Sequence, residues 1–137
     1  KPNAVLVIPI FKNKIGLISI KRPTYDWQYS LEFPGGRIET GQTALEAAKR
    51  ELREETNLIS GNWESIGSVF PLPALTNEKV FAFKAHVFDI GNLSLQTNEF
   101  IEKMEFFTLE KAKKLLLFGK VLNSIHAYWL AVFLMNR

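Results

Sequence analysis

The chain has 137 residues, of which 47% are hydrophobic and 23% are charged, and these values are typical of one globular domain. Its net charge of +3 and pI near 9.2 suit an anionic substrate but are too small to predict nucleic-acid binding. The absence of cysteine excludes disulfides, thiol catalysis and cysteine-zinc sites, and no signal peptide is apparent, so we expect a cytoplasmic protein.

The N-terminal part predicts a β-hairpin. Ala4–Phe11 and Ile15–Lys21 are rich in apolar and β-branched residues, and Lys12-Asn13-Lys14 separates them as a turn. Pro9 predicts an edge position or a bulge for the first strand, because proline cannot donate to a sheet ladder. A short strand at Leu31–Phe33 follows.

A helix is predicted after the glycine pair Gly35-Gly36. Thr43 and Glu46 form a capping-box pattern, so the helix is expected from about Ala44 to Thr56. Its expected buried stripe consists of Leu45, Ala48 and Leu52.

Three carboxylates share one face of this helix. Glu51, Glu54 and Glu55 fall at i, i+3 and i+4, where like charges repel and destabilise a helix. A divalent cation such as Mg²⁺ or Mn²⁺, which prefers oxygen ligands, would explain why they are together. Taken alone, such a run is more often a solvated acidic face.

The C-terminal half predicts three strands and two helices. Strands are expected at Trp63–Phe70, Val80–Phe88 and Met104–Phe107, with a turn at Gly61-Asn62 and a proline-containing loop at Pro71–Lys79. Thr108 caps a helix from about Leu109 to Phe118, and Gly119 ends it.

The tail from Val121 to Met135 is apolar on nearly every side but too short to span a membrane, which takes about 20 apolar residues. We expect a buried helix that packs on the sheet or makes a dimer contact, so a homodimer is left open. His126 is expected to be a core residue with a hydrogen-bond partner.

The segment from Gly36 to Leu58, GRIETGQTALEAAKRELREETNL, resembles the Nudix box. The positions that match are Gly36, Arg50, Glu51, Leu52, Glu54, Glu55 and Leu58. Gln42 replaces the first glutamate of the box, and Asn57 replaces its last glycine. Asn is the best substitute where a helix end needs a left-handed residue. The resemblance implies an α/β fold, an α/β/α sandwich with a mixed β-sheet between helices, in a single domain over residues 1–137.

The resemblance also implies a site for Mg²⁺ or Mn²⁺. Glu51 and Glu55 would be the main ligands, with the Gly35 carbonyl as a further one and Gly36 close to the substrate. Glu54 would be a weaker ligand or would orient water. The first box glutamate orients Arg50, a catalytic residue, and Gln42 could still accept a hydrogen bond from it without charge assistance.

Two later loops refine the expectation. Pro73, fifteen residues beyond Leu58, and Glu78 resemble marks of pyrophosphatases acting on ADP-ribose and other nucleoside-diphosphate sugars. In that branch an acidic loop brings a further glutamate to the metals or the attacking water. Glu99 aligns best with it and Glu102 is the alternative. Further candidates for substrate contact are Arg22, Trp27, Tyr29 and Glu32.

The predicted reaction is metal-dependent hydrolysis of the diphosphate in a nucleoside diphosphate linked to another group, most readily ADP-ribose, giving a nucleoside monophosphate and a sugar phosphate. One alternative is hydrolysis of nucleoside triphosphates or RNA 5′ ends. Another is a non-catalytic nucleotide-binding domain, which only Gln42 favours.

Overall fold

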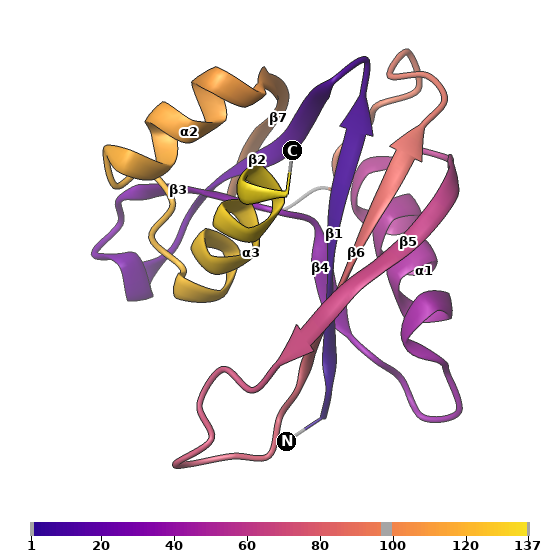
Figure 1. Cartoon of the computed structure of the whole chain (residues 1–137), viewed down its shortest axis with the longest axis vertical. Coiled ribbons are helices and arrows are strands. Elements are labelled where there is room, and N and C mark those ends of the chain that lie inside the picture. Colours follow the sequence, from indigo (N-terminus) through magenta and orange to yellow (C-terminus); the bar gives the residue numbers. More distant parts are fainter. Residues whose placement is uncertain (1, 97–99, 137) are drawn as a thin grey trace.

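The computed structural model describes residues 2–96 and 100–136. A seven-stranded mixed sheet separates one helix, α1, from two others, α2 and α3 (Figure 1). The elements in chain order are β1 (Ala4–Phe11), β2 (Lys14–Lys21), a 3₁₀ turn η1 (Pro23–Tyr25), β3 (Tyr29–Glu32), β4 (Gly35–Arg37), α1 (Ala44–Thr56), β5 (Ser60–Val69), β6 (Val80–Val87), β7 (Ile101–Thr108), α2 (Leu109–Leu117) and α3 (Ser124–Met135). The predicted fold class is confirmed.

Strand β1 explains why the sheet is covered on both faces. Successive side chains of a strand point to opposite faces. Val5 and Val7 therefore join the core beneath α1, whereas Leu6, Ile8 and Ile10 join the core beneath α2 and α3. A strand that is apolar at every position must be buried on both sides.

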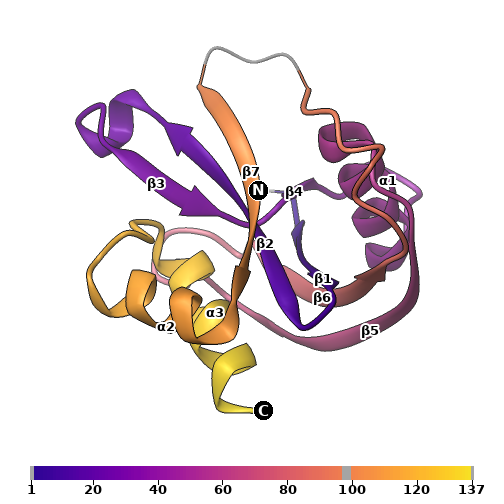
Figure 2. The ribbon, with the colours of Figure 1, turned by 90° about the horizontal axis from the view of Figure 1, so that it is seen from above.

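The sheet divides into two halves that meet at the β1–β2 hairpin. Strand β1 pairs along one side with β6 in parallel, and β2 pairs along one side with β7. On their other sides, β4 pairs with the start of β1 and β3 with the end of β2. The two halves diverge from the hairpin, as Figure 2 shows from above. Residues of both halves line the site described below.

Two details of the sequence interpretation were wrong. Pro9 lies neither at an edge nor in a bulge, because β1 is a central strand. On the side of β1 that faces β4 and β2, Pro9 falls between the residues that pair with β4 (4–6) and those that pair with β2 (10–11). Its missing N–H therefore removes no hydrogen bond from either of these two ladders. Gly61 and Asn62 are not a turn but lie within β5, where Asn62 has φ of 51° at a register shift.

The helices follow the expected pattern in most respects. Ala48 and Leu52 of α1 are buried as expected, but Leu45 is only partly buried because the buried face of the helix turns toward Ala47 and Thr56. Helix α1 has the predicted bounds and the complete capping box, with Asn57 left-handed at its C-terminus (φ 59°). Helix α3 starts later than predicted, at Ser124, because Asn123 caps it by accepting the Ile125 N–H. Trp129, Leu130 and Phe133 of α3 are buried, but one face remains exposed. None of the helices in the described ranges is both long and apolar enough to cross a bilayer.

Candidate active site

Arg50 gathers the polar groups around the acidic face of α1. Its Nη1 donates to Glu51 Oε1 at 2.9 Å and to Glu54 Oε2 at 3.2 Å. Its Nη2 donates to the Arg37 carbonyl at 2.9 Å and to Gln42 Oε1 at 3.2 Å. The predicted contact between Gln42 and Arg50 is therefore present. The guanidinium therefore holds two carboxylates on the acidic face of α1 and also holds the preceding loop at residues 37 and 42.

Glu51 and Glu55 form a partly buried acidic pair. Burial raises the pKa of Glu51, although Arg50 opposes the shift. Burial also raises the pKa of Glu55 to about 7; a hydrogen bond from the Gly35 N–H opposes this shift and the negative charge of Glu51 adds to it. A bound cation would stabilise the charged form of Glu55, which burial and the neighbouring Glu51 disfavour.

The glycine pair lies directly against these carboxylates. The Gly35 N–H donates to Glu55 Oε1 at 2.8 Å. A Cβ at Gly36 would collide with the Glu51 carboxylate, so a larger residue there would have to displace that carboxylate. Strand β4, which sequence reasoning did not predict, holds the pair by pairing with residues 4–6 of β1. The oxygen-only donor set and the close backbone fit a hard divalent cation such as Mg²⁺ or Mn²⁺.

In the described ranges no group of three or more His, Asp or Glu side chains converges as a ready ligand set. Glu54 points its carboxylate to Arg50 and its side chain is 56% exposed. Glu99, the other predicted ligand, lies outside the described residues. The acidic pair Glu51–Glu55 is therefore the centre of the candidate metal site.

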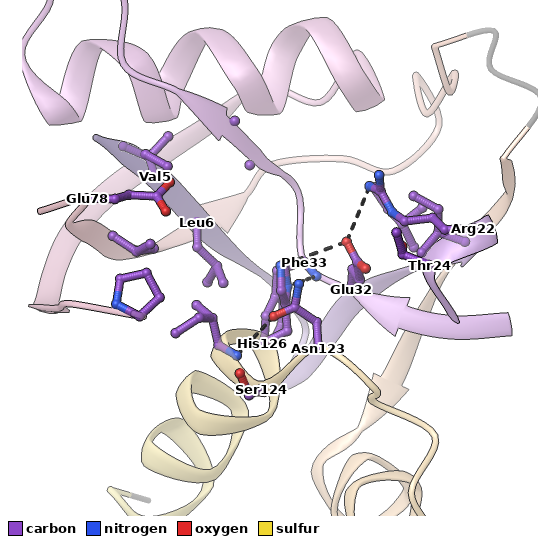
Figure 3. A pocket seen from close by; sticks show the side chains of 18 of the residues that line it. Val5, Leu6, Arg22, Thr24, Glu32, Phe33, Glu78, Asn123, Ser124 and His126 are labelled. Atoms are coloured by element: carbon purple, nitrogen blue, oxygen red, sulfur yellow. Dashed lines mark hydrogen bonds and ion pairs between the residues drawn. The ribbon is translucent and has the colours of Figure 1, made fainter. Parts of the chain in front are cut away.

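A cavity of about 650 Å³ opens beside the acidic pair, between the two halves of the sheet. Its wall is formed by Gly35, Gly36 and Glu55 on one side and by the end of β2, η1 and the start of α3 on another. Residues 71–72, 76 and 78 of the loop between β5 and β6 complete it. Figure 3 shows Glu78 and Arg22 at opposite ends of this cavity.

Glu32 is the centre of a second polar cluster in the same cavity. It is 8% exposed and accepts a short hydrogen bond from the Tyr25 hydroxyl. Burial and the Glu32 contact raise the pKa of Tyr25 to about 12. Arg22 Nη2 lies 3.7 Å from Glu32 Oε1, and His126 Nε2 lies 3.9 Å from the same oxygen. Among the described residues nothing accepts a hydrogen bond from Arg22 Nε, which is buried.

His126 is neutral in this cluster. Its Nδ1 accepts the Phe33 N–H at 2.9 Å, so this nitrogen carries no proton. Burial lowers the pKa of His126 to about 4 despite the nearby carboxylate. The neutral ring agrees with the 3.9 Å separation from Glu32, which is too long for a hydrogen bond.

The structure brings some of the predicted site residues into the cavity and leaves others outside. Those that line it are Arg22, Glu32, Gly35, Gly36, Glu55 and Glu78. Pro73 borders a separate shallow hollow with Phe70 and Leu75. Trp27 and Tyr29 are 55% and 50% exposed and are not among the lining residues.

Glu102 is exposed on β7, where it raises the pKa of Tyr29 through a hydrogen bond. Sequence reasoning missed Tyr25 and Asn123 and gave His126 no function. No local pattern identifies them, because they reach the cavity only through the fold.

The comparison that decides the family is a match to the NUDIX domain over residues 1–128. The chain belongs to the Nudix family. The resemblance to this family is thereby confirmed, and the segment that resembles its box, with the glycine pair and the acidic helix, lies within the matched residues.

Three relatives are similar in sequence. An 8-oxo-dGTP diphosphatase of Haemophilus influenzae is 40% identical over 57 residues, 40% of this chain and 42% of that protein. An ADP-ribose pyrophosphatase of Bacillus subtilis is 31% identical over 130 residues, 93% and 69% of the two chains. An ADP-ribose pyrophosphatase of Methanocaldococcus jannaschii is 30% identical over 112 residues, 82% and 66%. The chain thus spans less than half of the first relative and about two thirds of the others.

A solved structure described as an ADP compounds hydrolase has the same fold. It matches with a TM-score of 0.77 at 23% identity, covering 99% of this chain and 71% of that one. The similarity supports the α/β/α sandwich.

Proposed function

We propose that this Nudix protein hydrolyses the diphosphate linkage of a nucleoside diphosphate joined to a sugar, with ADP-ribose as the first candidate. The observation that carries the proposal is the cavity that extends from Glu55, the member of the acidic pair that lines it, to the polar cluster around Glu32. The two long matches to ADP-ribose pyrophosphatases support the same substrate class. Water would add across one P–O–P bond, giving a nucleoside monophosphate and a sugar phosphate.

The chain's own groups suit this reaction. Glu51 and Glu55 would hold Mg²⁺ or Mn²⁺, with Gly35 and Gly36 keeping the backbone close. When bound, such an ion neutralises phosphate charge and lowers the pKa of a water molecule. Arg50 holds Glu51 in place while it also binds Gln42.

The wall opposite the acidic pair supplies the contacts for an anionic substrate. Arg22 reaches the cavity with an unpaired Nε–H, as judged from the described residues, and a guanidinium binds phosphate oxygens well. Thr24, Asn123 and Ser124 add short polar side chains to the same wall (Figure 3). Apolar residues of β1, β2 and α3 complete it, as is usual for a site that takes a large organic ligand.

A second candidate is hydrolysis of a nucleoside triphosphate to a monophosphate and pyrophosphate. The 40% identity to an 8-oxo-dGTP diphosphatase favours it, although that match covers only 57 residues. The metal site would be the same, and the two candidates differ in what occupies the Glu32 end of the cavity.

A Mg²⁺-dependent hydrolysis screen with product identification tests the proposal. The panel contains ADP-ribose, other nucleoside-diphosphate sugars, dinucleotides, 8-oxo-dGTP, ordinary dNTPs and 5′-triphosphate RNA. We expect AMP and ribose 5-phosphate from ADP-ribose, and loss of at least about 100-fold in rate in Glu55→Gln. Glu110→Gln, an exposed glutamate of α2, is the matched control and should keep full activity. Turnover of dNTPs without any sugar nucleotide would replace the proposal with the second candidate.

A further inference from the structure

Residues 33–35 form a short connection tied to three different elements. The Phe33 N–H donates to His126 Nδ1 of α3 at 2.9 Å. The Pro34 carbonyl accepts the Val7 N–H of β1 at 2.8 Å. The Gly35 N–H donates to Glu55 Oε1 of α1 at 2.8 Å. Each successive residue is therefore held by a different part of the fold, and the last bond ends on the acidic pair.

His126 is built to accept that first hydrogen bond. Its side chain is 14% exposed, and its ring stacks on the Phe33 ring with centroids 6.1 Å apart and planes at 19°. Because Nδ1 receives the Phe33 N–H, the ring proton is on Nε2, which faces Glu32 and Arg22 (Figure 3). A protonated ring would place a second N–H against the Phe33 N–H and break the bond.

Few torsions separate this bond from the metal site. Between the Phe33 N–H and the Gly35 N–H lies Pro34, whose φ is fixed by its ring. Apart from the planar peptide bonds, only the two Phe33 torsions and the Pro34 ψ can change between the two N–H groups. The Pro34 carbonyl and the Gly35 N–H belong to one planar peptide, which the Val7 N–H of β1 holds at the carbonyl, so His126 and β1 hold the connection at its two ends.

We infer that His126 is a positioning residue for the acidic pair: by holding the Phe33 N–H, it fixes one end of the connection whose other end, the Pro34–Gly35 peptide held by β1, presents the Gly35 N–H to the Glu55 carboxylate. It acts through the backbone and does not lie between Glu55 and the substrate. The role of the cation in this inference rests on the proposed function, but the link from His126 to the Gly35 N–H does not.

Two amide substitutions separate this role from simple packing. Asn places its side-chain oxygen where Nδ1 lies, so His126→Asn can still accept the Phe33 N–H. Gln places its amide at the position of Nε2, so His126→Gln leaves that N–H unpaired with similar polarity. Leu130→Ala is the control, since Leu130 is a fully buried residue of α3 in the core beneath the sheet that neither donates to nor accepts from residues 33–35 through its side chain.

The readouts are the ¹H–¹⁵N shift and hydrogen exchange of the Gly35 amide, Mn²⁺ affinity by electron paramagnetic resonance, and the Mg²⁺ concentration for half-maximal hydrolysis. We expect His126→Gln to shift the Gly35 amide and weaken Mn²⁺ binding about 10-fold, the scale of lost outer-sphere support. His126→Asn should stay within about twofold of the parent protein. Leu130→Ala should lower stability and leave Mn²⁺ affinity and the Gly35 amide unchanged.

The inference would be overturned if His126→Asn and His126→Gln had the same Mn²⁺ affinity and the same Gly35 amide shift. This holds whether both variants resemble the parent protein or both differ from it. The same change in Leu130→Ala would overturn it too, because α3 packing alone would then suffice. If His126→Gln does not fold, His126→Leu takes its place in the comparison. Absence of hydrolysis by the parent protein would remove the proposed function, but the amide and Mn²⁺ measurements would still decide this inference.

Discussion

Gln42 occupies the position of the first box glutamate, and its side-chain oxygen receives both the Arg50 guanidinium (3.2 Å) and the Glu39 N–H (3.1 Å). We predict that Gln42→Glu raises the hydrolysis rate about fivefold. A hydrogen bond with a charged acceptor is stronger than a neutral one by roughly 1 kcal/mol. The stronger bond would hold the Arg50 guanidinium more firmly, and Arg50 in turn holds the Glu51 carboxylate. Steady-state kinetics across Mg²⁺ concentrations measures the effect, and an unchanged rate would contradict this prediction.

His126 gives the folded protein a defined sensitivity to acid. Its pKa is about 4 in the fold against an ordinary value of 6.5, because burial penalises the charged ring. Between these two pH values the unfolded chain binds more protons than the folded one. The free energy of unfolding contributed by this residue therefore rises with pH through the window and is complete above pH 6.5.

The prediction is a loss of order 3 kcal/mol between pH 6.5 and 4 that His126→Asn does not show. Urea unfolding of both proteins across this range gives the difference curve. Glu55 titrates in the opposite sense in both proteins and cancels in the difference. Parallel curves for the two proteins would mean that His126 is not buried as a neutral ring.

At the level of elements, the end of α1 balances two effects at Asn57. Its backbone is left-handed (φ 59°), which costs most residues with a Cβ about 1 kcal/mol and Asn less, while its Nδ2 donates to the Asn92 carbonyl at 2.9 Å. Asn57→Gly removes the backbone cost and loses the hydrogen bond to Asn92, so the free energy of unfolding should change by less than about 0.5 kcal/mol.

Asn57→Ala should lower the free energy of unfolding by about 1–2 kcal/mol, since it keeps the strained backbone and loses the hydrogen bond. Chemical denaturation at equal pH measures all three proteins. A gain of more than 1 kcal/mol in Asn57→Gly would show that the bond to Asn92 contributes nothing. The last box glycine would then be simply the better residue here.

Helix α1 shows why part of this structure could be predicted. Its bounds, cap and acidic face depend on Thr43, Glu46 and residues a few positions away, so the local pattern was sufficient. Strand β4 has only three residues, and its existence depends on pairing with β1, which no local pattern contains. Gly61-Asn62 resembles a turn locally, but pairing with β6 converts it into a bulge.

The candidate site divides in the same way. Glu51, Glu54 and Glu55 are neighbours along one helix, so their proximity follows from helical periodicity. Tyr25, Glu32 and His126 come from η1, β3 and α3, and only the assembled sandwich brings them together. The acidic face of α1 therefore follows from local periodicity, whereas the contacts among Tyr25, Glu32 and His126 do not.

Considered as a whole molecule, the protein carries a stability cost at its candidate metal site. The pKa of Glu55 in the fold is raised to about 7 from an ordinary 4.5, so the folded state binds more protons than the unfolded chain in this window. The free energy of unfolding from this group falls as pH rises from 4.5 to 7. At pH 8 without metal, the ionised Glu55 therefore opposes folding.

The final prediction is a reversal in thermal stability at pH 8. Without metal, Glu55→Gln should melt at a higher temperature than the parent protein, because the neutral amide removes the buried charge beside Glu51. With Mn²⁺ at 100 times its dissociation constant, the parent protein gains about 2.7 kcal/mol, a rise of roughly 5–10 °C for a chain of this size. Glu55→Gln should lose most of this rise, and Glu110→Gln should keep it. Equal Mn²⁺ shifts in the parent protein and Glu55→Gln would place the cation somewhere other than the acidic pair.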